Sequence, residues 1–234
     1  MTKKVLFLSL VFVIFFNLSA FAKPKYGPKA IPLSFDQAYL KKAAAPDFWA
    51  LMPYYTAQQS GSACSIASVT MLLNALRVGA PLTTDDELVT QPGLIKKTGD
   101  AAWANSGVVL DELGDKVRAS LKAYGLEKYS AKVIHVNAAL TKKKFVEMLV
   151  ANERSRSDVI LINYIQGSLT DDSPIGHIAP IGAYDAKTDR VLVLDPDREW
   201  YEPYWSKSAD VLAGMQTEDK LVKKNRGLVW VRKE

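Results

Sequence analysis

The chain has very little of two residue types that often carry chemistry: its 234 residues include one cysteine, Cys64, and two histidines, His135 and His177. A single cysteine excludes an internal disulfide framework. The longest run of basic residues is Lys142-Lys143-Lys144, so the charge pattern does not indicate a nucleic-acid partner. Since 48% of the residues are hydrophobic, the chain can bury one sizeable core, and we expect one globular domain.

The N-terminus has the pattern of a secretory signal peptide, with two early lysines, an apolar run from Val5 to Phe16, and the small-residue pattern Ala20-Phe21-Ala22. We predict that residues 1–22 are a signal peptide cleaved after Ala22 and that the protein is exported to the periplasm. The alternative is an uncleaved membrane anchor, but the apolar run is shorter than the ~20 residues that a spanning helix needs. We expect no stable membrane association after cleavage.

The rest of the chain is predicted to contain a leader segment at residues 23–46, rich in Lys, Pro and Ala, and one domain at residues 47–234. Apolar residues at helical spacing follow Cys64, and Gly79 and Pro81 are expected to end this helix. Cys64 therefore lies in the first turn of a predicted helix.

Two more helical patterns run over Val108–Tyr124 and from Thr141 onward, and later runs rich in Val, Ile and Leu are typical of strands. The predicted strands are Lys132–Val136, Val159–Ile165, His177–Tyr184, Arg190–Asp195 and Leu228–Val231. Helices followed by strands predict an α+β domain with a mainly antiparallel sheet.

The sulfur of Cys64 has two interpretations. Unpaired N–H groups and the helix dipole favour a thiolate at a helix N-terminus, and the thiolate is the nucleophilic form of cysteine. Free cysteines are also among the most buried residue types and often serve only as small apolar filler. A nucleophile needs a base, so the choice depends on the two histidines.

His177 is the better candidate for this base. His135 lies in the alternating pattern Lys132–Val136, where we expect an outward-facing, solvated side chain. His177 enters an apolar strand, where an imidazole needs hydrogen-bond partners. The alternative for His177 is a core histidine with purely structural partners.

Two aspartates are candidates for the group that orients His177. The segment Tyr184–Arg190 is turn-like, so the strands on its two sides are predicted to form a hairpin. A three-residue loop would place both aspartates on the face of His177, with Asp197 directly opposite and Asp195 at a diagonal. A four-residue loop would turn Asp195 to the other face, so the hairpin alone leaves the choice open.

Gln58 lies six residues before Cys64, with the small residues Ser60–Ala63 between them. A side-chain amide at this place would join the Cys64 N–H as an oxyanion hole. The alternatives are that Gln58 is a solvated loop residue and that the neighbouring Gln59 takes this role.

The order Gln58, Cys64 opening a helix, and then His177 and Asp195 on strands resembles the papain-like cysteine peptidase superfamily. From about Asp47 to the C-terminus the chain further resembles phytochelatin synthase, in particular its short bacterial form. The segments that carry this resemblance are Gln58–Leu76, Leu110–Gly114, Val159–Tyr164, Gly176–Pro180 with Ala183-Tyr184, Thr188–Arg190, Asp195 and Lys224–Gly227. The resemblance implies a papain-like fold, with the nucleophile on an N-terminal helix that packs on the sheet.

The resemblance also implies acyl transfer on glutathione. Cys64 would attack the amide carbon between cysteine and glycine, release glycine and hold a γ-glutamylcysteinyl thioester. His177 would act as base and then acid, Asp195 would orient it, and Gln58 would stabilise the oxyanion. Water would then give γ-glutamylcysteine, and a second glutathione would give phytochelatin. We favour hydrolysis with weak transpeptidation.

Three charged residues match positions of the same family. Asp219 and Arg226 correspond to its γ-glutamyl-binding residues, with a surface ion pair as the alternative, and Arg198 corresponds to an arginine after the aspartate. We expect no cysteine-rich extension of the plant type, no required cofactor and no protein metal site. Cadmium or zinc would enter as a glutathione complex. The oligomeric state is left open, with a homodimer as one alternative.

Two other functions remain as alternatives. One is a cysteine peptidase of the bacteriocin-processing type, which cleaves peptides after a double-glycine leader. The other is an exported binding domain in which Cys64 is inert. Measuring glycine release from glutathione against peptide cleavage separates the two enzymes.

We predict that iodoacetamide labels Cys64 faster than it labels a model thiol near neutral pH, because the helix N-terminus favours the thiolate. We also predict that Cys64→Ser abolishes glutathione turnover. Labelling at the rate of the model thiol, together with unchanged turnover in the variant, would mean that the cysteine is inert.

Overall fold

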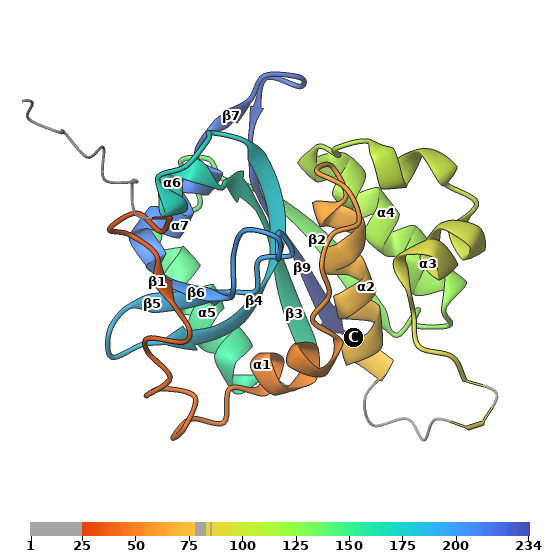
Figure 1. Cartoon of the computed structure of the whole chain (residues 1–234), viewed down its shortest axis with the longest axis horizontal. Coiled ribbons are helices and arrows are strands. Elements are labelled where there is room, and N and C mark those ends of the chain that lie inside the picture. Colours follow the sequence, from red (N-terminus) through yellow and green to blue (C-terminus); the bar gives the residue numbers. More distant parts are fainter. Residues whose placement is uncertain (1–24, 78–82, 85) are drawn as a thin grey trace, which may run out of the picture.

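A computed structural model describes residues 25–77, 83–84 and 86–234. In this structure, helices cover both faces of an antiparallel sheet (Figure 1). The α+β class predicted from the sequence is confirmed. The predicted signal peptide at residues 1–22 and the predicted helix end at Gly79 and Pro81 lie outside the described residues. Within the described ranges, no helix is both long enough and apolar enough to cross a membrane.

Among the described residues, seven strands form the main sheet in the order β1-β6-β5-β4-β3-β9-β2, and each neighbouring pair is antiparallel. Strands β7 and β8 form a separate hairpin that projects at the top of Figure 1. The strands are β1 (Ile31–Pro32), β2 (Tyr129–His135), β3 (Asp158–Ile165), β4 (Gly176–Asp185), β5 (Arg190–Val193), β6 (Tyr204–Lys207), β7 (Glu218–Asp219), β8 (Lys224–Asn225) and β9 (Gly227–Lys233).

The helices divide between the two faces of the sheet. Helices α2 and α4 lie on one face, and α5 and α7 lie on the other (Figure 1). The helices are α1 (Pro46–Leu51), α2 (Cys64–Arg77), α3 (Gln91–Thr98), α4 (Leu110–Ala123), α5 (Lys142–Arg154), α6 (Gly167–Thr170) and α7 (Ser208–Met215), with 3₁₀ turns at Met52–Tyr54 and Ala101–Asn105. Alternate residues of a strand therefore enter two separate cores: Val159 and Leu161 of β3 face α2, whereas Ile160 and Ile162 face α5 and α7.

The predicted helices are confirmed as α2, α4 and α5, and the predicted strands as β2, β3, β4, β5 and β9, although β5 ends at Val193 and not at Asp195. The order of elements is more mixed than helices first and strands later: α5 lies between β2 and β3, as the predicted ranges already had it, and α7 lies between β6 and β7. These helices are needed there to cover the second face of the sheet. The sequence prediction did not include the helices α1, α3, α6 and α7 or the strands β1, β6, β7 and β8.

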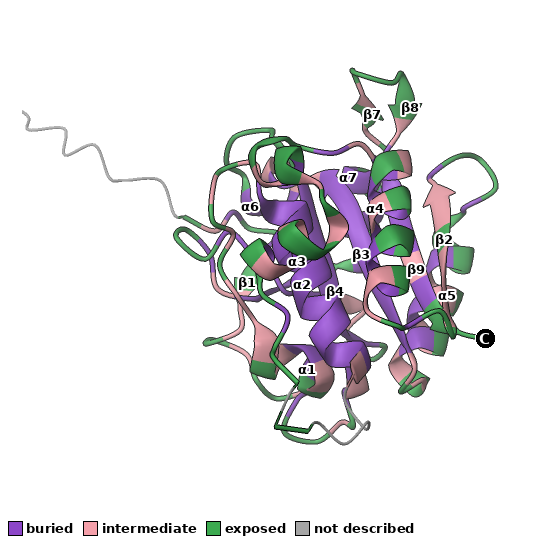
Figure 2. Ribbon diagram, turned by 90° about the vertical axis from the view of Figure 1, so that its right-hand side faces the viewer, coloured by how far each residue is buried: buried purple, intermediate pink, exposed green. Residues whose placement is uncertain are grey.

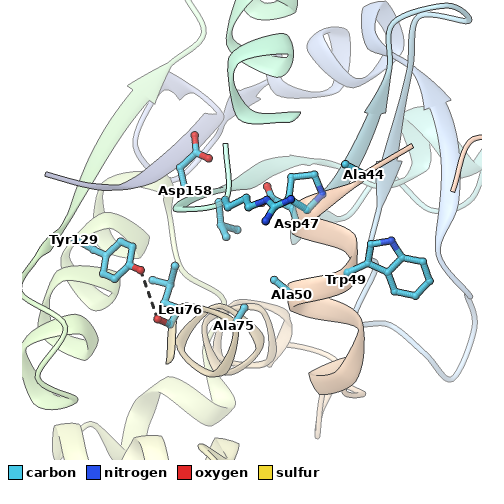
Figure 3. A pocket seen from close by; sticks show the side chains of 11 residues that line it. Ala44, Asp47, Trp49, Ala50, Ala75, Leu76, Tyr129 and Asp158 are labelled. Atoms are coloured by element: carbon cyan, nitrogen blue, oxygen red, sulfur yellow. Dashed lines mark hydrogen bonds between the residues drawn. The ribbon is translucent and has the colours of Figure 1, made fainter. Parts of the chain in front are cut away.

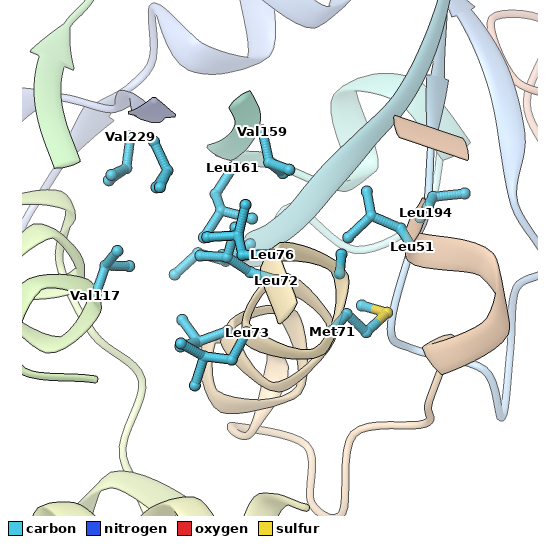
Figure 4. Packing of buried hydrophobic residues seen from close by; sticks show 14 of the residues in the cluster. Leu51, Met71, Leu72, Leu73, Leu76, Val117, Val159, Leu161, Leu194 and Val229 are labelled. Carbon is cyan, nitrogen blue, oxygen red and sulfur yellow. The ribbon is translucent and has the colours of Figure 1, made fainter. Parts of the chain in front are cut away.

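Helix α2 is the central element of the fold, and its residues from Cys64 to Leu76 are all buried (Figure 2). Figure 4 shows side chains of α2, among them Leu72 and Leu76, packed beside Leu161 of β3. The Ser68 hydroxyl, one turn after Cys64, donates a hydrogen bond of 3.0 Å to the carbonyl oxygen of Ile178 on β4. Because Ile178 follows His177, this bond fixes the start of α2 against the strand that carries the histidine.

The segment predicted as a leader is attached to the sheet. Strand β1 pairs with β6, which places Ile31 opposite Trp205. Asp36 accepts a hydrogen bond of 2.7 Å from Arg190, and its backbone oxygen accepts one of 2.9 Å from the Trp205 indole. Residues before α1 therefore contribute an edge strand to the folded unit.

The β4–β5 hairpin contains a β-bulge that decides which face Asp195 occupies. Asp185 pairs with Arg190, so the loop has four residues, the second of the two lengths considered from the sequence. A four-residue loop alone would turn Asp195 away from His177. However, Gly182 is an extra residue between two register pairs, and beyond it Ile181 lies opposite Val193. The bulge thus returns Asp195 to the face of His177.

Gly182→Ala tests this bulge. A Cβ atom at residue 182 would lie 2.9 Å from Cγ of the buried Leu194, so the strand that leads to Asp195 must move. We expect a loss of about 1–3 kcal/mol in the free energy of unfolding, measured by urea titration. Gly61→Ala is the matched control, because a Cβ there meets no atom within 4 Å. Equal stability of the two variants would contradict this account of the bulge.

Candidate active site

The structure brings Cys64, His177 and Asp195 together from three different elements. Cys64 is the first residue of α2, His177 is the second residue of β4, and Asp195 follows β5 beyond the bulge. Their residues are 6%, 2% and 0% exposed, respectively. The Cys64 N–H lies in the first turn of α2 and so has no partner within the helix.

His177 and Asp195 form a buried hydrogen-bonded pair, with 2.7 Å between Nε2 of the histidine and Oδ1 of the aspartate. The Asp197 backbone N–H donates to the same oxygen at 2.9 Å. The other oxygen, Oδ2, accepts hydrogen bonds from the side chains of Tyr164 at 3.2 Å, Gln166 at 2.9 Å and Tyr204 at 2.9 Å. Five donors therefore surround one carboxylate that has no contact with solvent.

This set of donors keeps Asp195 ionised. Burial acts to raise its pKa, but the charge of His177 and the hydrogen bonds from His177, Gln166 and the Asp197 N–H lower the pKa to about 2. Burial likewise acts to lower the pKa of His177. The charges of Asp195 and Cys64, with hydrogen bonds to both, raise the pKa of His177 well above its usual value. The site therefore favours an imidazolium at His177.

The hydrogen bond to Asp195 also decides which ring nitrogen of His177 is available for Cys64. Since Nε2 is engaged by the carboxylate, Nδ1 is the nitrogen left for the thiol. The ring of Tyr164 packs edge-on against the imidazole, with 5.9 Å between ring centroids. Tyr164 thus restrains both members of the His177–Asp195 pair.

Asp197, the other aspartate considered from the sequence, does not bond His177. Its backbone N–H donates to Asp195. Burial and the charge of Asp195 raise the pKa of its carboxyl group. Its place in the site is to support Asp195.

The segment with Gln58 is bonded to the chain that follows Asp195. The Gln58 N–H donates to the carbonyl oxygen of Pro196 at 2.8 Å. The side-chain Oε1 of Gln58 is buried without a hydrogen-bond partner among the described residues, so the amide is not committed to a structural bond through this atom. The competing Gln59 is exposed, and its N–H donates to the side chain of Gln91.

Asp219 and Arg226 lie in one cavity with Cys64 and His177. This cavity has a volume of about 470 Å³, and its lining includes these four residues and Asn163. Arg226 Nη2 is 3.4 Å from Asp219 Oδ2, and the two side chains are only 10% and 13% exposed, so they do not form a surface ion pair. The Nε atom of Arg226 and the Oδ1 atom of Asn163 are buried without partners among the described residues.

Arg198 lies outside this cavity. It is exposed, and its guanidinium stacks on the ring of Tyr55, 4.4 Å from the centroid. The hydroxyl of Tyr55 donates to the backbone oxygen of Asp195 at 2.5 Å. The structure thus connects Arg198 to the site through Tyr55. Neither Gln58 nor Arg198 lines the cavity that contains Cys64.

His135 differs from the solvated side chain expected from the sequence. It is half-buried, and both ring nitrogens contact oxygen atoms: Nδ1 lies 2.6 Å from the Asn225 carbonyl oxygen, and Nε2 lies 2.7 Å from Asp111 Oδ1. The alternating strand pattern could not show these partners, because Asp111 belongs to α4 and Asn225 to β8.

A second cavity, of about 370 Å³, lies at the other end of α2 (Figure 3). Trp49, Leu76 and Tyr129 are among its lining residues, and the Tyr129 hydroxyl donates to the Leu76 carbonyl oxygen. None of the residues proposed from the sequence lines this cavity.

Across the described ranges, no three His, Cys, Asp or Glu side chains are grouped in a way that could hold a metal ion.

The sequence interpretation missed Tyr164, Gln166 and Tyr204, the side chains that bond Asp195 Oδ2. Tyr164 lies near the end of β3 and Gln166 directly follows this strand, and polar groups in a largely apolar stretch are a usable signal because buried polar groups need partners. Tyr204 lies on β6, which was not predicted.

The fold and the site together have the arrangement of proteins with a cysteine nucleophile: a cysteine at a helix N-terminus, beside a histidine that is paired with an aspartate. The chain belongs to the phytochelatin synthase family, whose sequence model matches residues 30–228.

Several relatives are named as glutathione gamma-glutamylcysteinyltransferases. The chain is 27% identical to number 3 of Lotus japonicus over 194 residues, which cover 80% of this chain and 37% of the relative. It is 27% identical to glutathione gamma-glutamylcysteinyltransferase 1 of Lotus japonicus, over 79% of this chain and 35% of the relative. It is 25% identical to glutathione gamma-glutamylcysteinyltransferase 1 of Arabidopsis thaliana, over 85% of this chain and 39% of the relative. The chain therefore spans less than half the length of these relatives.

We predict that His177 stays an imidazolium at pH values well above 6.5, and that Asp195→Asn shifts its titration to lower pH. The reason is that the variant keeps the burial of the imidazole, which lowers its pKa, and loses the carboxylate, which raises it. With two histidines in the chain, NMR of ¹⁵N-histidine-labelled protein resolves both rings. Asp210→Asn, at the partly exposed Lys29–Asp210 pair, is the control and should change nothing. An unshifted titration in Asp195→Asn would contradict this electrostatic account.

Proposed function

We propose that the protein transfers the γ-glutamylcysteinyl group of glutathione through a thioester on Cys64. The observation that carries this proposal is one cavity that contains both a reactive end, with Cys64 and His177, and a charged recognition end, with Asp219 and Arg226. Family membership and the printed names of the relatives support the choice of glutathione as substrate.

In this mechanism the Cys64 thiolate attacks the carbonyl carbon of the cysteine–glycine amide. The C–N bond breaks as His177 gives its proton to the glycine amine, and the thioester carbon stays on sulfur. His177 then accepts a proton from the acyl acceptor as that acceptor attacks the thioester. Asp195 keeps Nε2 of His177 engaged, so Nδ1 faces the reaction in both half-reactions.

The recognition end suits the zwitterionic head of the γ-glutamyl group. The guanidinium of Arg226 would bond the α-carboxylate, and Asp219 would bond the α-ammonium group. The unpartnered Arg226 Nε offers a donor that the protein does not use itself. This arrangement favours a free amino acid head over the interior of a peptide chain, because a peptide bond carries neither charge.

The oxyanion of the tetrahedral intermediate would be stabilised by the Cys64 N–H and the Gln58 side chain, as in a papain-like fold. The donor to the oxyanion would be the Nε2 group of Gln58, and its support is the backbone bond to Pro196, which attaches this segment to the chain that follows Asp195. Arg198 is proposed as a residue that acts through Tyr55, or on a substrate outside the main cavity.

We favour water as the main acyl acceptor, with γ-glutamylcysteine as product and phytochelatin as a minor product. Glutathione is the partner, and cadmium or zinc would take part as a metal–glutathione complex that replaces free glutathione as substrate. We keep a signal peptide at residues 1–22 and export to the periplasm as parts of the same proposal, together with one domain that includes residues 47–234 and the preceding strand β1.

We predict that Arg226→Lys and Asp219→Asn each raise KM for glutathione about ten- to hundredfold, with a smaller change in kcat, because each removes a charged hydrogen bond to the substrate. Cys64→Ser should lower kcat about 10³-fold or more. The assay is glycine release with and without cadmium, with products separated by mass. Arg118→Lys and Asp115→Asn alter an exposed pair of the same residue types and serve as matched controls.

A peptide with a double-glycine leader tests the rival peptidase activity in the same assay. Faster cleavage of this peptide than of glutathione, or an unchanged KM in both cavity variants, would contradict the proposed function.

A further inference from the structure

His135 makes two hydrogen bonds that a neutral imidazole cannot make together. Nδ1 lies 2.6 Å from the carbonyl oxygen of Asn225, and Nε2 lies 2.7 Å from Asp111 Oδ1. A backbone carbonyl oxygen only accepts hydrogen bonds, and so does an ionised carboxylate. Both ring nitrogens must then donate, and only the imidazolium form of His135 carries two N–H groups.

The carboxylate of Asp111 stays ionised in this arrangement. Hydrogen bonds from Lys224, at 2.7 Å to Oδ2, and from His135 hold the pKa of Asp111 below its usual range. Asp111 therefore links two cationic groups, one from β2 and one from β8. The proton that completes the contact belongs to His135.

This contact lies at the base of the β7–β8 hairpin, which carries Asp219. The end of β2 holds the hairpin base at three points: the His135 contact with the Asn225 oxygen, a bond from the Val136 N–H to the Arg226 oxygen at 2.9 Å, and a bond from Asn225 Nδ2 to the Val136 oxygen at 2.7 Å. Arg226, which follows Asn225, lines the cavity of Cys64.

The same contact also reaches a second part of the cavity lining. Asp111 is the second residue of α4, and Val108 and Val109, just before this helix, line the cavity. His135 thus connects the helix that bounds one side of the cavity to the hairpin that carries its charged end.

We propose that His135 is a positioning residue: its imidazolium joins Asp111 to Asn225 and holds the hairpin with Asp219 and Arg226 in its binding position. Loss of the His135 proton breaks one of the two bonds and weakens substrate binding without changing the reacting groups. This inference rests on the proposed function only in taking glutathione as the substrate of the cavity.

Several other charged side chains lie on the elements around His135. Arg118 of α4 bonds the Ala131 backbone oxygen on the same strand as His135, and Lys144 and Glu147 of α5 line the same surface groove as His135. The charged residues on these elements are Asp111, Arg118, Lys132, Lys144, Glu147, Lys224 and Arg226.

The first test uses ligand-free protein labelled with ¹⁵N. NMR should show both ring nitrogens of His135 protonated at low pH, and the amide signals of Asn225 and Arg226 should shift at the pH where His135 loses its proton. In Asp111→Asn, a neutral His135 can donate through Nδ1 and accept from the new amide through Nε2, so the hairpin signals should no longer follow pH. Asp115→Asn, on the same helix, is the control and should keep the wild-type response.

The second test measures glycine release from glutathione over the same pH range. KM should rise about tenfold as His135 loses its proton, with kcat following a different pH profile, and Asp111→Asn should remove this rise in KM. His135→Gln provides a second variant whose KM should no longer change at that pH.

If the amide signals of Asn225 and Arg226 do not shift when His135 loses its proton, the inference is wrong, whether or not the protein turns over glutathione. Hairpin signals that follow His135 in a protein that does not turn over glutathione would support the positioning role and overturn the proposed function. A KM that rises equally in wild type and Asp111→Asn would also overturn the inference.

Discussion

The hydrogen bond between His177 and the fully buried Asp195 is the interaction on which the site depends. An ionised carboxylate without solvent is costly unless its lone pairs are satisfied, and five donors from four different parts of the chain satisfy this one. Tyr164 and Gln166 come from the end of β3, and Tyr204 comes from β6. The ionised state of Asp195 therefore depends on the packing of the sheet, because the sheet brings these donors to its carboxylate.

This dependence on the folded sheet limits how much of the site could be predicted from the sequence. Cys64 and His177 could be identified from the sequence, because helical spacing places Cys64 in a first turn and the chain has only two histidines. Asp195 was not settled by pairing, since its face depends on the bulge at Gly182, which a count of loop residues cannot show. The tyrosine and glutamine donors were missed because they meet Asp195 only after the sheet has formed.

The elements missed from the sequence were the short ones with weak periodicity. Helix α7 and strand β6 have few residues each, and their stability comes from contacts with the sheet and not from local pattern. The charges of Asp219 and Arg226 were found by resemblance alone, and the structure adds that they share a cavity with Cys64. His135 was judged solvated because its partners, Asp111 and Asn225, are distant in the sequence.

The central claim is that Cys64 carries the acyl group of glutathione during turnover. The most direct measurement is mass spectrometry of protein quenched in acid within the first turnovers, followed by digestion to locate the added mass. The account predicts a γ-glutamylcysteinyl adduct on the peptide that contains Cys64, formed as glycine is released and lost on treatment with hydroxylamine. Glycine release with no adduct on Cys64, or with an adduct at another residue, would contradict it.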